Sequence, residues 1–234
     1  MVIGIDTSGK VCSVAAVLEG STVAEFSINH KRTHSAMLVP MLDTMLKHAG
    51  LDIHDTSLFA VANGPGSFTG LRIGAATAQG LSLALDKPVI GISTLLALSY
   101  NLKSSNSLVC PIMDARRNQV YTGVYDYSDR NKKMESIVPI LIDPMAIDIR
   151  ELLDKLNDFG REVVFLGDGV PVYLKFIEQS AKFAYSFAPG NSNVQRASSV
   201  ALLAELLYKD NAKSKSLKLE YLRRPQAERE RLGL

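Results

Sequence analysis

The sequence predicts an α/β protein of two lobes, each a mixed sheet with helices on both faces. Two observations predict this class. The order of three strands, helix, strand, helix, strand and helix in the first half is followed again from residue 108 onward. Each half also opens with a buried strand that ends in an aspartate, Asp6 or Asp114. Three antiparallel strands that continue into parallel β–α–β units give such a mixed sheet.

In the first half, the predicted helix over 35–49 has the clearest pattern, because apolar residues recur on one face at helical spacing. Pro40 lies inside this pattern, so the helix either starts near it or kinks there, and Gly50 marks its end. A further helix follows the glycine-rich loop and runs to about Leu85. The remaining predicted elements are strands at 2–6, 11–18, 22–28, 57–62 and 88–92, and a helix over 94–102.

The second half repeats this order with little sequence identity to the first. Its predicted strands are 108–114, 119–127, 135–142, 163–167 and 183–187, and its predicted helices are 144–157, 171–180 and 196–209. The order is typical of ribonuclease-H-like lobes that face each other across a cleft. We therefore predict two domains, an N-terminal lobe over 1–106 and a second, degenerate lobe over 107–234.

The composition is that of a globular protein. Of 234 residues, 47% are apolar and 21% are charged, and the formal net charge is 26 − 24 = +2. Cys12 and Cys110 are too few for a disulfide framework or a Cys-rich zinc site, which favours a reducing compartment. The first residues do not resemble a signal peptide, and no apolar run is long enough to span a membrane. We expect a soluble cytoplasmic protein.

The C-terminal segment, residues 212–234, is basic. It holds seven basic and three acidic residues, a net charge of +4. Such a tail could contact RNA phosphates or an acidic partner, or it could be a solvated terminal segment.

Several motifs together resemble one family. The sequence resembles the bacterial TsaB (YeaZ) family, within the sugar kinase, heat-shock 70 and actin superfamily of ATPases, almost from end to end. The motifs are IDTS at 5–8, HSAMLVP at 34–40, GPGSFTGLRIG at 64–74, DARRNQVY at 114–121, GDG at 167–169 and YLRRPQA at 221–227.

The resemblance implies a function. TsaB is a non-catalytic partner of the related TsaD, which receives threonylcarbamoyl-AMP and builds N6-threonylcarbamoyladenosine at position 37 of tRNAs that read ANN codons. A small ATPase, TsaE, also joins the complex. We therefore expect a homodimer when the chain is alone, contact with tRNA through the complex, and no cofactor of its own, with ATP or ADP and a divalent metal only in the complex. The alternative is an autonomous ATPase or small-molecule kinase of the same fold.

Asp6 and Asp114 are candidate nucleotide-binding residues with two possible roles. In ATPases of this fold such an acid holds a magnesium-bound water near the phosphates. Alternatively, the carboxylate caps its hairpin by accepting hydrogen bonds from backbone N–H groups. In the second half, Arg116 and Arg117 stand where a close approach of backbone to phosphate would need glycine. Their side chains could bind an anion instead.

The loop that contains Gly66 and Ser67 is a second candidate anion site. Glycines and a hydroxyl residue at the start of a helix can hold an anion with backbone N–H groups. No lysine follows with the spacing of a P-loop. A tight turn capped by Ser67 or Thr69 is the equal alternative.

Two helices are candidates for partner binding. Gly70, Gly74 and Ala78 recur every four residues, which lets another backbone come close. That neighbour could be a strand of the same lobe, or a helix of a second copy or of TsaD. The helix over 35–49 carries methionines, which adapt to partner surfaces: Met37, Met41 and Met45.

The sequence predicts no metal site. TsaD carries an HxxxH pair on the helix after its fifth strand, and the corresponding residues here are Thr94 and Leu98. Leucine cannot ligate a metal, and threonine is a poor ligand on its own. His30 and His34 have the spacing of a helical pair, but His30 ends a strand pattern, which disfavours a metal site there.

Overall fold

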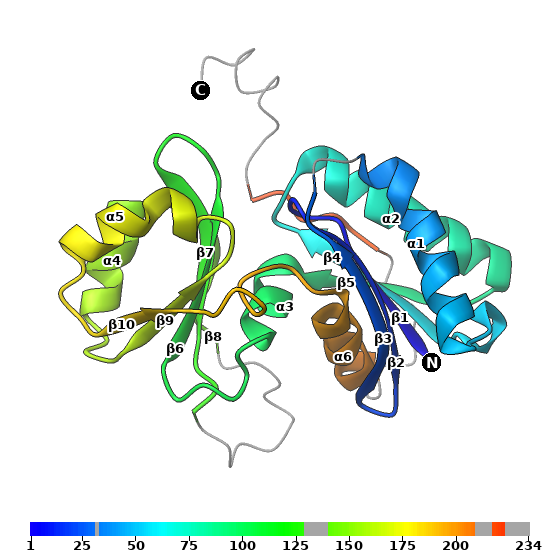
Figure 1. The fold of residues 1–234 in the computed structure, drawn as a ribbon. Coiled ribbons are helices and arrows are strands. Elements are labelled where there is room, and N and C mark those ends of the chain that lie inside the picture. Colours follow the sequence, from blue (N-terminus) through cyan, green and yellow to red (C-terminus); the bar gives the residue numbers. More distant parts are fainter. Residues whose placement is uncertain (31–32, 129–139, 209–216, 223–234) are drawn as a thin grey trace.

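The first lobe is a five-stranded mixed sheet in the order β3–β2–β1–β4–β5 (Figure 1). The computed structural model of the chain describes residues 1–30, 33–128, 140–208 and 217–222. Strands β1, β2 and β3 are antiparallel, whereas β4 and β5 run parallel to β1. The strands are β1 (Val2–Asp6), β2 (Cys12–Leu18), β3 (Ser21–Ile28), β4 (Leu58–Gly64) and β5 (Val89–Ser93).

The second lobe repeats this arrangement in the order β10–β9–β6–β7–β8. Strands β6, β7 and β8 are antiparallel, and β9 and β10 continue parallel to β6. The strands are β6 (Leu108–Asp114), β7 (Gln119–Tyr125), β8 (Ile140–Asp148), β9 (Val163–Leu166) and β10 (Tyr185–Phe187). The predicted α/β class and the repetition are confirmed, since β1 and β6 hold the same central place in their sheets and end in Asp6 and Asp114.

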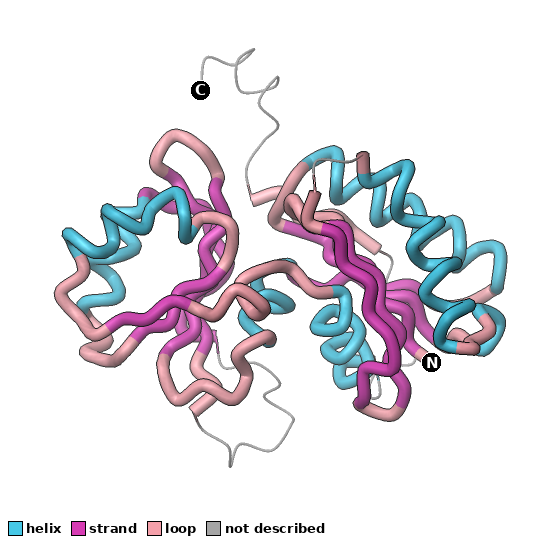
Figure 2. Tube along the Cα trace, viewed as in Figure 1, coloured by secondary structure: helices cyan, strands magenta, loops and turns pink. Residues whose placement is uncertain are grey.

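Helices cover both faces of each sheet, so the molecule is layered (Figures 1 and 2). Helices α1 and α2 lie outside the first sheet, α4 and α5 lie outside the second, and α3 and α6 lie between the two sheets. Their bounds are α1 (His34–Ala49), α2 (Phe68–Leu85), α3 (Thr94–Tyr100), α4 (Ile149–Asn157), α5 (Val170–Ser180) and α6 (Ala197–Tyr208), with a 3-10 turn, η1, at Ile53–Asp55.

The central strands are buried on both faces, which explains their nearly continuous apolar sequences. In β4, Phe59 and Val61 pack under α1 and α2, whereas Leu58 and Ala60 pack against α6. Successive side chains of a strand point to opposite faces, so one strand contributes to two cores.

Helix α1 begins at His34 and continues through Pro40, with the predicted apolar face buried against the sheet. Gly50 ends it in the left-handed conformation (φ 64°), where its N–H reaches the last carbonyls.

The predicted strand over 135–142 and helix over 144–157 are displaced. Strand β8 pairs with β7 as far as Asp148, so α4 begins only at Ile149. The Asp148 side chain accepts a hydrogen bond from the Arg150 N–H, and this cap fixes the start of the helix. Residues 135–139 lie outside the described residues.

The predicted boundary between residues 106 and 107 does not hold for the C-terminal part of the chain. Val200, Ala201 and Leu203 of α6 pack against Val2 and Leu58 of the first sheet. At Gly4 of β1, a Cβ atom would overlap the carbonyl oxygen of Ala197, so the helix lies directly on the strand. The described residues after α6, 217–222, also contact the first lobe. The rest of the basic tail, 212–216 and 223–234, lies outside the described residues.

Among the described residues, none of the helices combines the length and the apolar character that crossing a membrane requires.

Candidate functional site

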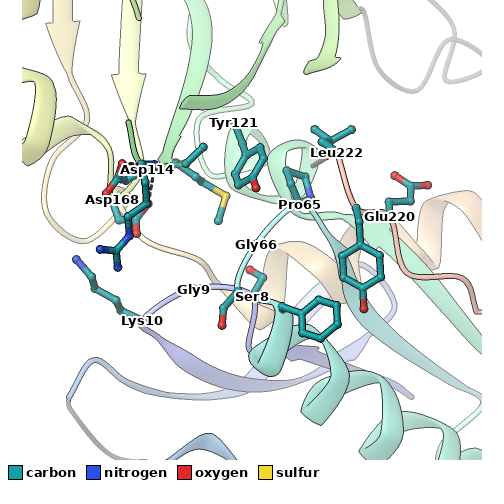
Figure 3. Close-up of a pocket in the computed structure, with 16 residues that line it drawn as sticks. Ser8, Gly9, Lys10, Pro65, Gly66, Asp114, Tyr121, Asp168, Glu220 and Leu222 are labelled. Atoms are coloured by element: carbon teal, nitrogen blue, oxygen red, sulfur yellow. Dashed lines mark hydrogen bonds between the residues drawn. The ribbon is translucent and has the colours of Figure 1, made fainter. Parts of the chain in front are cut away.

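A cavity of about 440 Å³ lies between the two lobes (Figure 3). Four segments form most of its wall: the β1–β2 hairpin (8–10), the β4–α2 loop (65–68), the start of the β6–β7 hairpin (113–116) and the C-terminal segment 220–222. Asp168, just after β9, completes the wall on the side of the second lobe. The cavity thus lies where the two equivalent hairpins face each other.

Asp6 does not line this cavity. Its side chain is 1% exposed, and its Oδ1 accepts hydrogen bonds from the backbone N–H of Ser8 (2.9 Å) and from the Ser8 hydroxyl (2.6 Å). Burial raises the pKa of Asp6 to about 6, although the two Ser8 hydrogen bonds and the charge of His34 act in the opposite direction. The hydrogen bonds of Oδ1 are those of the hairpin cap. The other carboxylate oxygen, Oδ2, is buried and has no hydrogen-bond partner among the described residues.

Asp114 makes the equivalent hydrogen bond in the second lobe, but it does line the cavity. Its Oδ1 accepts from the backbone N–H of Arg116 (2.8 Å) and from the Tyr173 hydroxyl (3.4 Å). The N–H of Asp114 donates to Asp168 (3.3 Å). Burial raises the pKa of Asp168, while the charge of Lys10, which extends toward it from the first lobe, opposes that shift (Figure 3).

The turn of the β6–β7 hairpin has an unusual backbone. Arg116, Arg117 and Asn118 all have positive φ, at 65°, 55° and 58°. This conformation costs residues with a Cβ atom free energy, and here hydrogen bonds at both ends of the turn hold it. All three residues are exposed, so arginine side chains occupy the space where glycines would let a phosphate approach the backbone. The predicted anion contact of Arg116 would therefore use its side chain.

Gly66 and Ser67 line the cavity, and both are tied to the β1–β2 hairpin. A Cβ atom at Gly66 would overlap the Ser8 carbonyl oxygen, and the Ser67 N–H donates to that same oxygen (2.7 Å). The Ser67 hydroxyl accepts from the Gly70 N–H (3.3 Å) and caps α2. The loop therefore forms the tight turn capped by Ser67, which was the alternative to an anion site. Of the five predicted anion-binding residues, the structure therefore brings four to the cavity and buries Asp6 beneath it.

Comparison with known proteins decides the family. A family model described as tRNA N6-adenosine threonylcarbamoyltransferase, TsaD, matches residues 21–230. A Bacillus subtilis protein named tRNA threonylcarbamoyladenosine biosynthesis protein TsaB is 33% identical over 97% of this chain and 96% of its own length. The chain belongs to the TsaB family. The Escherichia coli protein of the same name is 37% identical over 53% of the chain and 54% of its own length. YeaZ from Pseudomonas aeruginosa matches in structure with a TM-score of 0.73 and 25% identity, over 90% of this chain and 93% of that one.

The two residues that correspond to the TsaD metal pair, Thr94 and Leu98, are both buried. Leu98 is buried among apolar residues of α3 and the second sheet, and Thr94 is buried in the first turn of α3. His34 Nε2 lies 3.0 Å from the Gly9 carbonyl oxygen, in a hydrogen bond that joins α1 to the first hairpin. Within 1–30, 33–128, 140–208 and 217–222, no three His, Cys, Asp or Glu side chains are grouped as metal ligands.

Most residues predicted to bind a partner point into the first lobe of this TsaB-family chain and not toward solvent. Gly70, Gly74 and Ala78 are buried against the lobe itself: a Cβ atom at Gly70 would overlap the Thr7 carbonyl oxygen, and one at Gly74 would lie 2.5 Å from Thr7 Oγ1. Met41 and Met45 are buried in the core, and Met37 is half-buried against it. The small residues thus let the β1–β2 hairpin approach α2, which was the same-lobe alternative.

The opposite faces of the same two helices are exposed. On α2, Ala76, Gly80 and Ala84 repeat the spacing of four on the solvent side, and Leu83 beside them is 86% exposed. Val39 of α1 is 51% exposed. We call these five residues the outer helix face. A Cβ atom at Gly80 would meet nothing within 4 Å, so no contact inside the lobe requires glycine there. The sequence signal for this face was Gly80 itself, since glycine destabilises a helix interior.

The segment 217–222 also contributes to the site, and no local sequence pattern indicates this. The Glu220 N–H donates to the Asn63 carbonyl (2.8 Å), and the Asn63 side chain donates to the Lys218 carbonyl (3.1 Å). The Tyr221 ring packs on Phe68, with 5.1 Å between ring centroids, and the Arg72 guanidinium lies 3.8 Å from the centre of the Phe68 ring. The segment therefore closes one side of the cavity.

Proposed function

We propose that this chain is the non-catalytic partner of a TsaD-like enzyme that forms N6-threonylcarbamoyladenosine on tRNA. The observation that carries this proposal is the match over 97% of the chain to a protein named for that biosynthesis. The family model, which is described by the transferase activity, supports a common ancestry with the enzyme. A role on tRNA would place the chain in the cytoplasm.

Three features at the cavity and near it support a partner role over catalysis by this chain. Asp6 is engaged with Ser8 below the cavity, the β6–β7 hairpin carries arginines in place of glycines, and Leu98 cannot ligate a metal. The alternative, an autonomous ATPase or small-molecule kinase, gains no support from these residues. ATP or ADP and a divalent metal remain predictions for the complex alone.

The test is a modification assay with a purified TsaD-like partner, threonylcarbamoyl-AMP and unmodified tRNA, with and without this chain. We expect nucleoside analysis to detect N6-threonylcarbamoyladenosine at a much higher rate when the chain is present. The chain alone should give no product and negligible ATP hydrolysis. Robust magnesium-dependent hydrolysis by the chain alone, abolished in Asp6→Ala, would instead support the kinase alternative.

The outer helix face is our candidate for the contact with the TsaD-like partner. Val39 and Leu83 offer apolar area, and the small residues of α2 let a second helix come close. Helices α1 and α2 lie side by side, so a partner with a similar pair would form a four-helix contact with pseudo-two-fold symmetry (Figure 1). The chain alone would pair with a second copy through the same face. A TsaE-like ATPase would then join the assembled pair, which mixing the three purified proteins would test.

Gly80→Arg should block pairing while the monomer stays folded. Position 80 has open space around it, and arginine is a better helix former than glycine, so the fold should tolerate the change. At a close helix contact, the same side chain would be forced between the partners and its charge would be desolvated. We expect the affinity for the TsaD-like partner to fall about tenfold or more.

Size-exclusion chromatography with light scattering measures the pairing, and circular dichroism reports folding. Gln179→Arg, at an exposed position of α5 in the second lobe, is the matched control and should pair normally. Undiminished pairing by folded Gly80→Arg would remove the outer helix face as the interface.

A further inference from the structure

A second groove, of about 460 Å³, lies on the second lobe outside the cavity between the lobes. It runs along the β6–β7 hairpin and the first turns of α4 and α5. We call it the arginine groove, because three of its lining residues are arginines: Arg116, Arg117 and Arg150. Asp114 is the one acidic residue among the described lining residues, which together carry 3 − 1 = +2. Arg117 and Arg150 do not line the cavity between the lobes.

The arginines of this groove form no ion pair with another described residue. Across the described residues, the ion pairs with a lysine or arginine join Lys47 to Asp43, Arg161 to Asp126 and Arg196 to Glu25, and none of them involves the arginine groove. Asp114 is already engaged by the Arg116 N–H and the Tyr173 hydroxyl. Arg116, Arg117 and Arg150 are all exposed. Among the described residues, the three arginines of the groove therefore outnumber its single carboxylate and form no ion pair.

The backbone fixes where these arginines stand. The Gln119 N–H donates to the Arg116 carbonyl (3.1 Å), and the Ile149 N–H donates to the Asn118 carbonyl (3.0 Å). The second bond ties the hairpin to the start of α4, next to Arg150. The hairpin and the helix therefore hold Arg117 and Arg150 along the same groove, which limits the freedom lost when a ligand binds.

The other wall of the groove is apolar. Val172, in the first turn of α5, is 54% exposed, and Phe176 follows one turn later, half-buried. The Arg150 guanidinium lies 5.9 Å from the centre of the Phe176 ring. Guanidinium groups match phosphate oxygens, and an aromatic ring beside them offers a surface on which an unpaired base can stack.

We propose that the arginine groove binds a single-stranded segment of tRNA, through its phosphates to Arg117 and Arg150 and through a base against Phe176. The choice of RNA as the occupant rests on the proposed function, which brings a tRNA to the complex. Proteins that recognise RNA commonly use this combination of arginines with an aromatic ring on unpaired loops and ends. Arg116 lines both the arginine groove and the cavity between the lobes, so the two adjoin at this residue.

The test compares two double variants of the full chain. Arg117→Ala with Arg150→Ala removes two charges from the groove. The matched control, Lys155→Ala with Lys182→Ala, removes two exposed charges, one in the last turn of α4 and one just after the end of α5. Fluorescence anisotropy measures binding of an unmodified, labelled tRNA that reads ANN codons, over a series of salt concentrations, first to the chain alone and then to the chain with its TsaD-like partner.

We expect the groove variant to lose about tenfold in affinity at low salt, and the slope of log affinity against log salt to become shallower by about 1.4, for two lost single-strand phosphate contacts. The control variant should stay close to the wild type. Equal affinity and slope in the two variants would overturn the proposal. A poly-glutamate peptide that binds the wild type and not the groove variant, while tRNA binds both alike, would assign the groove to an acidic peptide and also overturn it.

Failure of this proposal can be told from failure of the proposed function. Normal pairing and normal modification with unchanged tRNA binding in the groove variant would remove the arginine groove alone. The opposite result has two parts: the groove variant loses tRNA binding, and the wild-type chain does not stimulate a TsaD-like enzyme. That result would support the arginine groove as a tRNA site and contradict the proposed function.

Discussion

Gly70→Ala should destabilise the chain by about 3 kcal/mol, whereas Gly80→Ala, in the same helix, should stabilise it by about 1 kcal/mol. At position 70 the new methyl group would overlap the carbonyl oxygen of Thr7, which belongs to the β1–β2 hairpin and cannot rotate away as a side chain could. Thr7 Oγ1 also donates to the Gly70 carbonyl (2.7 Å), so a shift of α2 would break that hydrogen bond. At position 80 the methyl group meets nothing, and only the helix propensity changes.

Urea unfolding followed by circular dichroism, at concentrations where the chain is monomeric, measures both effects. Because the two substitutions are chemically identical and lie in one helix, their difference reports the surroundings alone. A Gly70→Ala variant as stable as the wild type would show that α2 does not lie this close to the hairpin.

Asp6→Asn should remove a pH dependence of stability that is specific to the wild type. The pKa of Asp6 in the folded chain, about 6, lies above its ordinary value of 3.8. Between these two pH values the folded state binds more protons than the unfolded state, so the free energy of unfolding decreases as the pH rises. The loss is complete above about pH 6 and amounts to on the order of 3 kcal/mol. Asparagine keeps the oxygen that accepts both hydrogen bonds from Ser8 but does not ionise.

The stability of Asp6→Asn relative to the wild type should therefore rise by on the order of 3 kcal/mol between pH 4 and pH 7.5. Urea unfolding at several pH values gives this difference directly, and other titrating groups cancel because both proteins share them. Asp86→Asn, at the exposed end of α2, is the control for loss of a carboxyl group. A stability difference that does not change with pH would mean that Asp6 is not buried as described.

The order of the strands could be predicted from the sequence because each strand and turn has a local pattern of apolar and turn-forming residues. Buried strands that end in Asp6 and Asp114, each followed by a hairpin, were enough to expect two equivalent lobes. The hairpin positions also led to Asp114, Arg116, Gly66 and Ser67, all of which line the cavity. These features depend on residues close together in the chain, so periodicity and turn chemistry reveal them.

What the sequence could not show depends on contacts between distant segments. Helix α2 carries small residues on two faces, at 70, 74 and 78 and at 76, 80 and 84, and periodicity does not say which face turns inward. The Thr7 carbonyl oxygen decides it, from 63 positions away. The packing of α6 on the first sheet and the contact of Glu220 with Asn63 are likewise invisible to local patterns. The sequence also missed the cap at Asp148, because an apolar run precedes it.

The packing of α6 on the first sheet has a consequence for folding of the chain during synthesis on the ribosome. Val2, Leu58 and Ala60 emerge early, yet the apolar surface that covers them, including Val200 and Leu203, is translated almost last. Until α6 is made, one apolar face of the N-terminal sheet stays exposed to solvent and prone to aggregation. The large sequence separation between this sheet and α6 makes their association slow. A chain that stops before α6 would therefore leave this apolar face of the N-terminal sheet uncovered.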